Sequence, residues 1–415
     1  MPYYNYSNIN LINNNQISKS FPNNIQSNNN INNLQFNNTC VDNNINNNIN
    51  NNQNNINSIN EVRNIPEEDI INGNEYKMKD VNEFIDYIKS IKLPLVSFLC
   101  TFDGSKEMIN ILNNSLYDCK IIILNSLNKK DLSKIMKNTI GNYFMQKLIN
   151  TLKENEIKYI LESIKQYFNE IAKSYSGTHV LQVLIDKITS KEIEELILSS
   201  IKGYEIEMAF NFNSTHVIQK IIMNIKDINR IDLNEIIIKN TKDLALNSNT
   251  IFLLKKFIST ITIEENKKKI INIISKYCVK IAQNAYGNYA IQYILEIWSP
   301  EDNDKINKRI INSVNMLSKQ KYSSNVVEKS IEFFDKKNRD KLINNLCFCE
   351  DTISLIKNKY GHFVFNRAIK YMSQDFKTKL SIKLQNDMVN LSSKEKSKIR
   401  KYVNSLDNTN VQKND

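Results

Sequence analysis

The sequence predicts an all-α protein, a solenoid of eight similar helical repeats. A short motif recurs eight times at intervals of 36 to 38 residues. Residues that favour helices, chiefly Leu, Ile, Lys and Glu, dominate the stretches between the motifs. Pro300 is the one proline between Leu95 and the C-terminus, so helices are seldom interrupted. Because residues 75–405 are too many for one globular core, we expect repeated units that pack on their neighbours.

Each repeat begins with a small anchor residue that is followed by a five-residue element. Five of the seven glycines are anchors, and all three histidines fall in the first two places of the element. Such regularity indicates one structural unit repeated along the chain. The anchors and elements are Gly104 with SKEMI, Gly141 with NYFMQ, Gly177 with THVLQ, Ser214 with THVIQ, Thr250 with IFLLK, Gly287 with NYAIQ, Ser323 with SNVVE and Gly361 with HFVFN.

The period leaves room for two full helices and a short third helix in each repeat. In the second repeat we predict a short helix near Asp131–Lys137 and a break at Asn138–Gly141. A helix from Asn142 to about Leu152 and another from about Asn155 to Lys165 complete the unit.

The element has two faces when it is placed on a helix. Its third and fourth residues are mostly apolar, as in Val180 and Leu181, and Leu184 and Ile185 continue the stripe one turn later. This stripe is expected to pack against neighbouring repeats, since a single unit cannot bury it. The first, second and fifth residues are expected to point outward and to line up along one surface.

The second residue of the element is aromatic or His in six of the eight repeats. Exposed flat rings at a regular spacing suit nucleic-acid bases, which stack on aromatic side chains. A core position for Tyr143 and Tyr289 is disfavoured because the apolar stripe already fills the buried face. Metal binding by His179 and His216 is disfavoured because no Cys or carboxylate cluster accompanies them. The predicted base-stacking residues are Tyr143, His179, His216, Phe252, Tyr289, Asn325 and Phe363.

The first and fifth residues could contact base edges. The amides of Asn142 and Gln146 donate and accept hydrogen bonds, which matches the Watson–Crick edge of uracil. An ionised Glu328 only accepts, which suits the two N–H donors of guanine, with Ser324 beside it. Such edges are free in single strands.

The NYxxQ and SNxxE elements, in register over eight units, resemble those of the Pumilio (PUF) family across about residues 80–400. The resemblance implies a right-handed crescent of three-helix Pumilio-type repeats with helical caps and single-stranded RNA on the concave face. It also implies that the last repeat meets the 5′ base, that Asn with Gln reads uracil and that Ser with Glu reads guanine. The base-edge residues carried over are Asn142, Gln146, Thr178, Gln182, Thr215, Gln219, Asn288, Gln292, Ser324, Glu328, His362 and Asn366.

By this carry-over the seventh repeat reads G, the sixth reads the following U, and the second reads a U further 3′. His362 departs from the usual Asn of the last repeat, but Asn366 keeps an amide for the 5′ U of a UGU core. Ile251 and Lys255 depart fully, so the fifth repeat is expected to read no base edge. The Thr/Gln pairs of the third and fourth repeats leave their base open. The first repeat, with Lys106 in its second place, is expected mainly to cap the array.

A basic row follows the element by one place and could contact phosphates, although a solvated basic face is an equal alternative. The residues are Lys147, Lys220, Lys256, Lys329 and Arg367.

Residues 1–74 are predicted to be a disordered Asn-rich segment. Residues 1–60 hold 27 Asn and two charged side chains, Lys19 and Asp42, which leaves too little apolar surface to offset the entropy of ordering. Compositional drift without a specific role is the simplest account of this tract. Residues 75–405 are predicted to form the repeat domain, and residues 406–415 a disordered tail.

The overall chemistry favours a cytosolic RNA-binding protein, with the nucleus as an alternative. The formal charge of +11 favours an acidic partner, although Lys enrichment could share the compositional origin of the Asn. The six cysteines show no metal-ligand spacing and favour a reducing compartment. We find no signal peptide, membrane-spanning run or catalytic motif. We therefore expect a protein without enzymatic activity, cofactor or metal. A monomer is also expected.

The family resemblance implies binding to messenger RNA 3′ untranslated regions for translational repression or control of transcript stability, together with protein effectors. Two alternatives stay open. One is a PUF-like ribosome-biogenesis factor that binds structured RNA, and the other is a helical-repeat scaffold that binds proteins. A protein scaffold has no reason to keep Asn/Gln and Ser/Glu pairs in register with flat residues.

Overall fold

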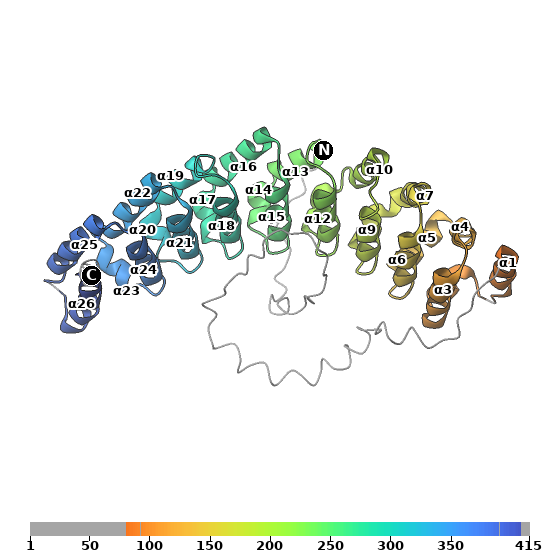
Figure 1. Cartoon of the computed structure of the whole chain (residues 1–415), viewed down its shortest axis with the longest axis horizontal. Helices are drawn as coiled ribbons and strands as arrows, with labels where there is room; N and C mark the ends of the chain where they lie inside the picture. The colour runs from red at the N-terminus through yellow and green to blue at the C-terminus, as the bar shows by residue number, and fades with distance from the viewer. Residues whose placement is uncertain (1–79, 92, 390, 408–415) are drawn as a thin grey trace, which may run out of the picture. The chain divides into compact units, whose positions relative to one another are not determined.

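The computed structural model describes residues 80–91, 93–389 and 391–407, which fall within one compact unit. Its regular elements are all helices in these ranges, so the all-α prediction is confirmed (Figure 1). The predicted Asn-rich segment lies outside the described residues. Helix α26 (Ser393–Asp407) includes residues 406 and 407, which were predicted to belong to a disordered tail, and the rest of that predicted tail lies outside the described residues.

Eight repeats of three helices follow one another, as the 36-to-38-residue period predicts. The short first helices are α2 (Leu95–Leu99), α5 (Lys129–Lys137), α8 (Phe168–Lys173), α11 (Glu205–Phe210), α14 (Thr241–Ala245), α17 (Cys278–Gln283), α20 (Val314–Leu317) and α23 (Thr352–Lys357). The second helices, here called the inner helices, are α3 (Phe102–Asn114), α6 (Gly141–Thr151), α9 (Gly177–Ile185), α12 (Ser214–Asn224), α15 (Ile251–Thr260), α18 (Gly287–Ile297), α21 (Ser323–Phe333) and α24 (Gly361–Tyr371).

The third helices, here called the outer helices, complete the repeats. They are α4 (Tyr117–Asn125), α7 (Glu154–Ile164), α10 (Lys191–Ile201), α13 (Ile231–Lys239), α16 (Glu264–Lys276), α19 (Asp304–Asn312), α22 (Lys336–Cys347) and α25 (Gln374–Asp387). Helix α1 (Val81–Ser90) precedes the first repeat and α26 follows the last. In the second repeat the predicted helix boundaries agree with the observed ones to within two residues.

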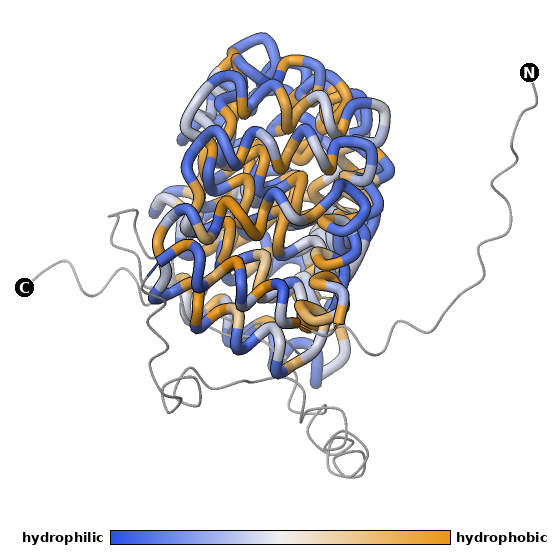
Figure 2. The backbone as a smooth tube through the Cα atoms, turned by 90° about the vertical axis from the view of Figure 1, so that its right-hand side faces the viewer, coloured by the Kyte–Doolittle hydropathy of each residue, from blue (hydrophilic) through white to orange (hydrophobic). Residues whose placement is uncertain are grey.

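The inner helices form one continuous layer, because each contacts the inner helix of the next repeat from α3 through to α24. Figure 1 shows them as one row, with the outer helices along the opposite side. The predicted apolar stripe is buried between repeats, and Val180, Leu181, Leu184 and Ile185 are fully inaccessible to solvent. Apolar positions recur in this way through successive repeats (Figure 2). The stacking predicted from the apolar stripe is therefore confirmed.

The anchor is small because the short first helix approaches it closely. A Cβ added to Gly177 would lie 2.3 Å from the carbonyl oxygen of Ile171, six residues earlier. Anchors that are not glycine use the same approach to form a hydrogen bond. The hydroxyls of Ser214, Thr250 and Ser323 donate to the carbonyl six residues earlier at 2.9, 2.6 and 2.7 Å. Glycine and hydroxyl residues thus satisfy one steric requirement, which fixes where each inner helix begins.

We expect Ser323→Ala to lower the free energy of unfolding by about 1 kcal/mol, because the Leu317 carbonyl loses its buried hydroxyl donor. Chemical denaturation of the full chain measures this change. Ser323→Thr is the matched control, since it keeps the hydroxyl and has a precedent in Thr250. An alanine variant as stable as the parent would show that the hydroxyl contributes nothing.

A buried arginine joins the fourth repeat to the fifth. The guanidinium of Arg230 donates to the carbonyl of Ile222 at 2.6 Å and to the hydroxyl of Thr260 at 2.7 Å. Burial lowers the pKa of Arg230 to about 10, so it stays protonated at neutral pH. Arg339 follows its anchor by the same 16 residues and donates to the carbonyl of Phe334 at 2.7 Å. Two of the chain's six arginines are therefore structural and do not support the charge argument for nucleic-acid binding.

Candidate nucleic-acid interface

The second residues of the elements form a row along the inner helices that carries a ring in six of the eight repeats. His179 in this row is exposed and His216 is half-buried. Tyr143 and Tyr289 are each 53% exposed, Phe252 is 60% exposed and Phe363 is 44% exposed. The anchors and inner helices repeat the same geometry, so each ring occupies the same place in its repeat. The predicted exposure of these four Tyr and Phe rings is confirmed, and a core role for the two tyrosines is excluded.

The first residues of the elements are buried in the first seven repeats, so the prediction that they point outward is wrong there, and His362 of the eighth repeat is half-buried. Asn142 is 4% exposed and Asn288 is 1% exposed; Thr178, Thr215 and Ser324 are equally covered. The two Asn side chains lie against the turn that precedes the inner helix. The Nδ2 group of Asn142 donates to the carbonyls of Asn138 and Thr139, both at 2.9 Å. Their local hydrogen bonds hold them below the surface.

The buried Asn orients the Gln that lies one turn later. Gln146 Nε2 donates to Asn142 Oδ1 at 3.0 Å, and Gln292 Nε2 donates to Asn288 Oδ1 at 2.8 Å. Both Gln residues are half-buried and border the exposed row. The second and sixth repeats therefore present the same preset amide beside the same tyrosine ring.

The Thr/Gln repeats hold their Gln differently. Gln182 Nε2 donates to the Thr178 carbonyl at 3.2 Å and lies 3.4 Å from the Thr178 hydroxyl. Gln219 Nε2 lies 3.5 Å from the Thr215 hydroxyl, and Gln219 is only 6% exposed, so the prediction that it points outward is wrong. The Thr178 hydroxyl instead donates to the Asn213 carbonyl of the next repeat at 3.0 Å. These repeats thus lack the short amide pair of the second and sixth.

The seventh repeat presents a carboxylate that the eighth repeat supports. Glu328 is half-buried, and its Oε2 lies 3.7 Å from Nε of Arg367. Burial raises the pKa of Glu328, while the charges of Arg367 and His362 oppose this rise. Asn325, the second residue of this element, is exposed beside it, and so is Asn366 in the eighth repeat.

The fifth repeat offers a ring without a base-edge partner of the amide or carboxylate type. Phe252 is exposed, but Ile251 is 3% exposed and belongs to the core. The ammonium of Lys255 lies 4.7 Å from the ring centroid of Tyr293 in the next repeat. Burial lowers the pKa of Lys255. The arrangement agrees with the prediction that this repeat departs from the pattern.

The basic row is partly neutralised by carboxylates that the sequence did not reveal. Lys220 pairs with Asp186 at 2.6 Å, and Lys329 pairs with Glu296 at 3.6 Å. Arg367 pairs with Glu328, as described above. Lys147 and Lys256 are exposed. Contact with phosphates stays a prediction, and it applies most directly to Lys147 and Lys256.

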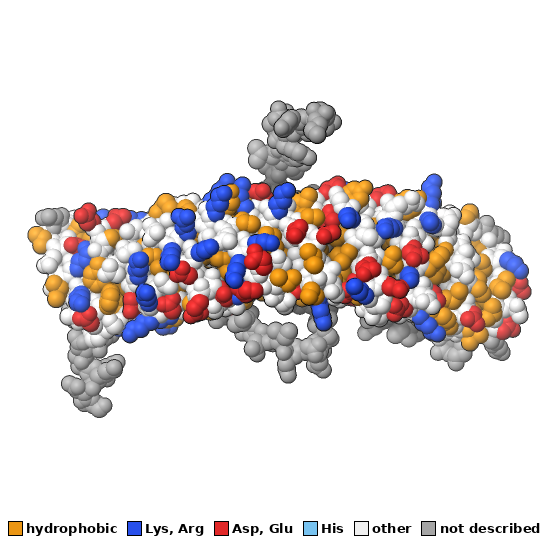
Figure 3. Space-filling view, turned by 90° about the horizontal axis from the view of Figure 1, so that it is seen from above, with side chains coloured by type: hydrophobic (Ala, Val, Ile, Leu, Met, Phe, Trp, Pro, Cys, Tyr) orange, Lys and Arg blue, Asp and Glu red, His pale blue; other side chains and the backbone are white. Residues whose placement is uncertain are grey.

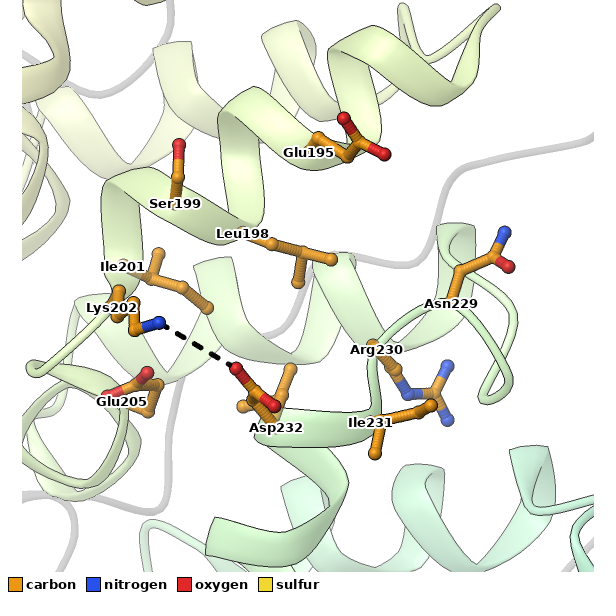
Figure 4. A pocket seen from close by; sticks show the side chains of 11 residues that line it. Glu195, Leu198, Ser199, Ile201, Lys202, Glu205, Asn229, Arg230, Ile231 and Asp232 are labelled. Atoms are coloured by element: carbon orange, nitrogen blue, oxygen red, sulfur yellow. Dashed lines mark ion pairs between the residues drawn. The ribbon is translucent and has the colours of Figure 1, made fainter.

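The opposite face of the array carries side chains of mixed charge. Figure 3 shows Lys and Arg side chains interspersed with Asp and Glu over the outer helices. A pocket of about 300 Å³ lies between α10 and α13, where Lys202 pairs with Asp232 at 3.9 Å (Figure 4). The buried Arg230 is one of the residues that line this pocket.

Metal-binding clusters and membrane-spanning helices are both absent from the described residues. No three His, Cys, Asp or Glu side chains gather there in an arrangement that could hold a metal ion. None of the helices in these ranges is long and apolar enough to cross a bilayer.

The model of the NOP9-like PUF repeat domain matches residues 111–363, and the model of the Pumilio-family RNA binding repeat matches residues 352–381. Pumilio homolog 12 of Arabidopsis thaliana is 26% identical over 302 residues, which cover 72% of this chain and 43% of the relative. A Pumilio domain-containing protein of Schizosaccharomyces pombe is 24% identical over 57% of this chain and 35% of the relative. The chain thus spans less than half the length of these two relatives.

Solved structures share the fold. The RNA-binding domain of yeast Puf5p bound to SMX2 RNA superposes with a TM-score of 0.66 at 21% identity, covering 76% of this chain and 97% of that chain. The Puf4 RNA binding domain bound to the HO endonuclease RNA 3′ UTR recognition sequence gives a TM-score of 0.62 at 23% identity, covering 77% and 94%.

Proposed function

Because this chain belongs to the Pumilio (PUF) family of RNA-binding repeat proteins, we propose that it binds single-stranded RNA along its inner helices, one base per repeat. The observation that carries this proposal is the row of exposed rings, each in the same place of its repeat and two of them beside a preset Asn/Gln amide pair. Bases stack on such rings, and their edges are accessible in single strands.

The proposed target contains UGU near its 5′ end. Glu328 would accept from guanine, the Gln292 amide would bind the following uracil, and Asn366 would contact the uracil that precedes the guanine. Gln146 would bind a uracil further 3′. The fifth repeat contributes Phe252 without an amide or carboxylate, so the base opposite it is expected to vary freely.

In vitro selection of short RNAs by the full chain tests both whether the protein binds single-stranded RNA and which repeat meets which base. We expect UGU to be enriched, followed by a variable position opposite the fifth repeat and a U opposite the second repeat. Selection of no RNA at all would remove the proposal. Selection of a motif without G would remove the role given to Glu328.

The biological role that we propose is post-transcriptional regulation through messenger RNA 3′ untranslated regions, by repression of translation or change of transcript stability. The support is the similarity to the Puf4 RNA binding domain, which is bound to a 3′ UTR recognition sequence in its solved structure. We propose a cytoplasmic location, with the nucleus as an alternative, a monomeric state, and recruitment of protein effectors.

A second candidate is a ribosome-biogenesis factor that binds structured RNA. The match to the NOP9-like domain over residues 111–363 and the departures in the first and fifth repeats favour it. The preset amide pairs favour the first candidate. Binding measured with one UGU sequence, presented single-stranded and within a hairpin stem, separates the two, because a base-edge mechanism requires the unpaired form.

A further inference from the structure

Two of the exposed aromatic side chains that lie outside the predicted ring row share one place in their repeats. Tyr175 is 69% exposed and Phe212 is 55% exposed, and each lies two residues before the anchor of its repeat. Single exposed apolar residues are common and need no explanation. These two are 37 residues apart, which is the repeat spacing, so they occupy the same place in the third and fourth repeats.

Each of these rings stands at a right angle to the His of its own repeat. The ring centroids of Tyr175 and His179 are 6.0 Å apart with an interplanar angle of 86°. Those of Phe212 and His216 are 6.5 Å apart with an angle of 84°. The same perpendicular pair therefore occurs twice, and in each pair the His is the second residue of its five-residue element.

The arrangement is confined to the two repeats that have His in the second place. Phe102 holds the equivalent place in the first repeat, beside Lys106 rather than a ring. In the remaining repeats the place is taken by residues without a ring, namely Thr139, Ser248, Ala285, Lys321 and Lys359. In the same two repeats the Gln lies 3.4 to 3.5 Å from the Thr hydroxyl, so these repeats lack the short Asn/Gln amide pair of the second and sixth repeats.

We propose that each of these ring pairs is a two-ring corner that holds one unpaired base, and that a purine is preferred; this rests on the proposed RNA binding. In a perpendicular pair one ring directs its edge at the face of the other. The ring that directs its edge is here called the first ring, and the ring whose face it meets is called the second ring. A base that stacks on the first ring is parallel to it, so the edge of the base also points at the face of the second ring. Offset stacking and edge-to-face contact are the two favoured aromatic geometries, so the base gains both. The fused rings of a purine cover the corner more fully than a single pyrimidine ring.

Binding of the selected RNA by full-chain variants tests the corner. We expect Tyr175→Ala and Phe212→Ala each to weaken binding roughly 5- to 150-fold, the range for loss of one stacked base. Tyr175→Phe should keep parental affinity. Tyr204→Ala is the matched control, because Tyr204 is 47% exposed and lies in the turn between α10 and α11, away from the inner helices in sequence. Since all three rings are exposed, the variants should unfold at the parental temperature.

A thermodynamic cycle that combines removal of the ring with removal of the base shows whether the loss of affinity comes from contact with that base. RNAs with an abasic site opposite the third or fourth repeat should lose little further affinity when the matching ring is removed. The parent should also bind less tightly when a pyrimidine replaces the purine there. Parental affinity in both alanine variants, or equal losses on intact and abasic RNA, would overturn the corner. A parent chain that selects no RNA would instead overturn the proposed function.

Discussion

Glu328→Gln is expected to remove the preference for guanine at the second position of a UGU target. The glutamine keeps the size of the side chain but replaces one acceptor oxygen with a donor, which opposes the N–H donors of guanine. A good two-point contact of this kind discriminates between bases by about 1–3 kcal/mol. Affinity for UGU should therefore fall roughly 5- to 150-fold relative to UAU, measured by titration of fluorescent RNAs.

Glu296→Gln is the matched control, because Glu296 is a carboxylate one repeat earlier that also pairs with a basic residue, Lys329. It should leave the preference for guanine unchanged. If the parent chain already bound UGU and UAU equally, the carboxylate would have no role in base recognition.

The same side chain should make guanine selectivity depend on pH. Burial raises the pKa of Glu328 above its ordinary value, so the carboxylate becomes protonated at a higher pH than an exposed glutamate. Protonation replaces an acceptor with an O–H donor. Selectivity should be complete above the raised pKa and should decline as the pH falls through it. Arg367, 3.7 Å away, limits the rise, and its replacement would move the decline to higher pH.

The fold was predictable because its signal is redundant. Each of eight units carries its own anchor and apolar stripe, so a departure such as Thr250 does not obscure the period. The reason for the small anchor residue was not predictable, because it depends on the close approach of a carbonyl six residues earlier in the preceding short helix. Sequence spacing locates the small anchor residue, but it does not identify the carbonyl oxygen whose close approach excludes a larger side chain.

The site was predictable in its rings and less so in its polar groups. Spacing on a helix placed Tyr143 and Tyr289 correctly on the surface. It placed Asn142 beside them, because helix periodicity takes no account of local hydrogen bonds that draw a side chain back to the preceding turn. Likewise the partners of the basic row, such as Asp186 for Lys220, come from the adjacent repeat and appear only once the repeats are stacked.

The largest loss of RNA affinity is expected from the double variant Tyr143→Ala/Tyr289→Ala. Each ring is 53% exposed and borders a preset Asn/Gln pair, so each should stack one base and contribute about 1–3 kcal/mol. The two rings are four repeats apart, so their effects should add, to about 2–6 kcal/mol. Titration of UGU-containing RNA measures the loss.

The double variant separates a surface role from a structural role. Tyr143→Phe/Tyr289→Phe should restore affinity, since stacking needs the ring and not the hydroxyl. Tyr159→Ala, which removes a 42% exposed ring from outer helix α7, should bind as the parent does. Exposed rings add little to folding, so helical content and thermal unfolding of the alanine variant should match the parent. A double variant that unfolds would mean that the rings support the stack. A folded variant with parental affinity would mean that the RNA does not follow the inner helices.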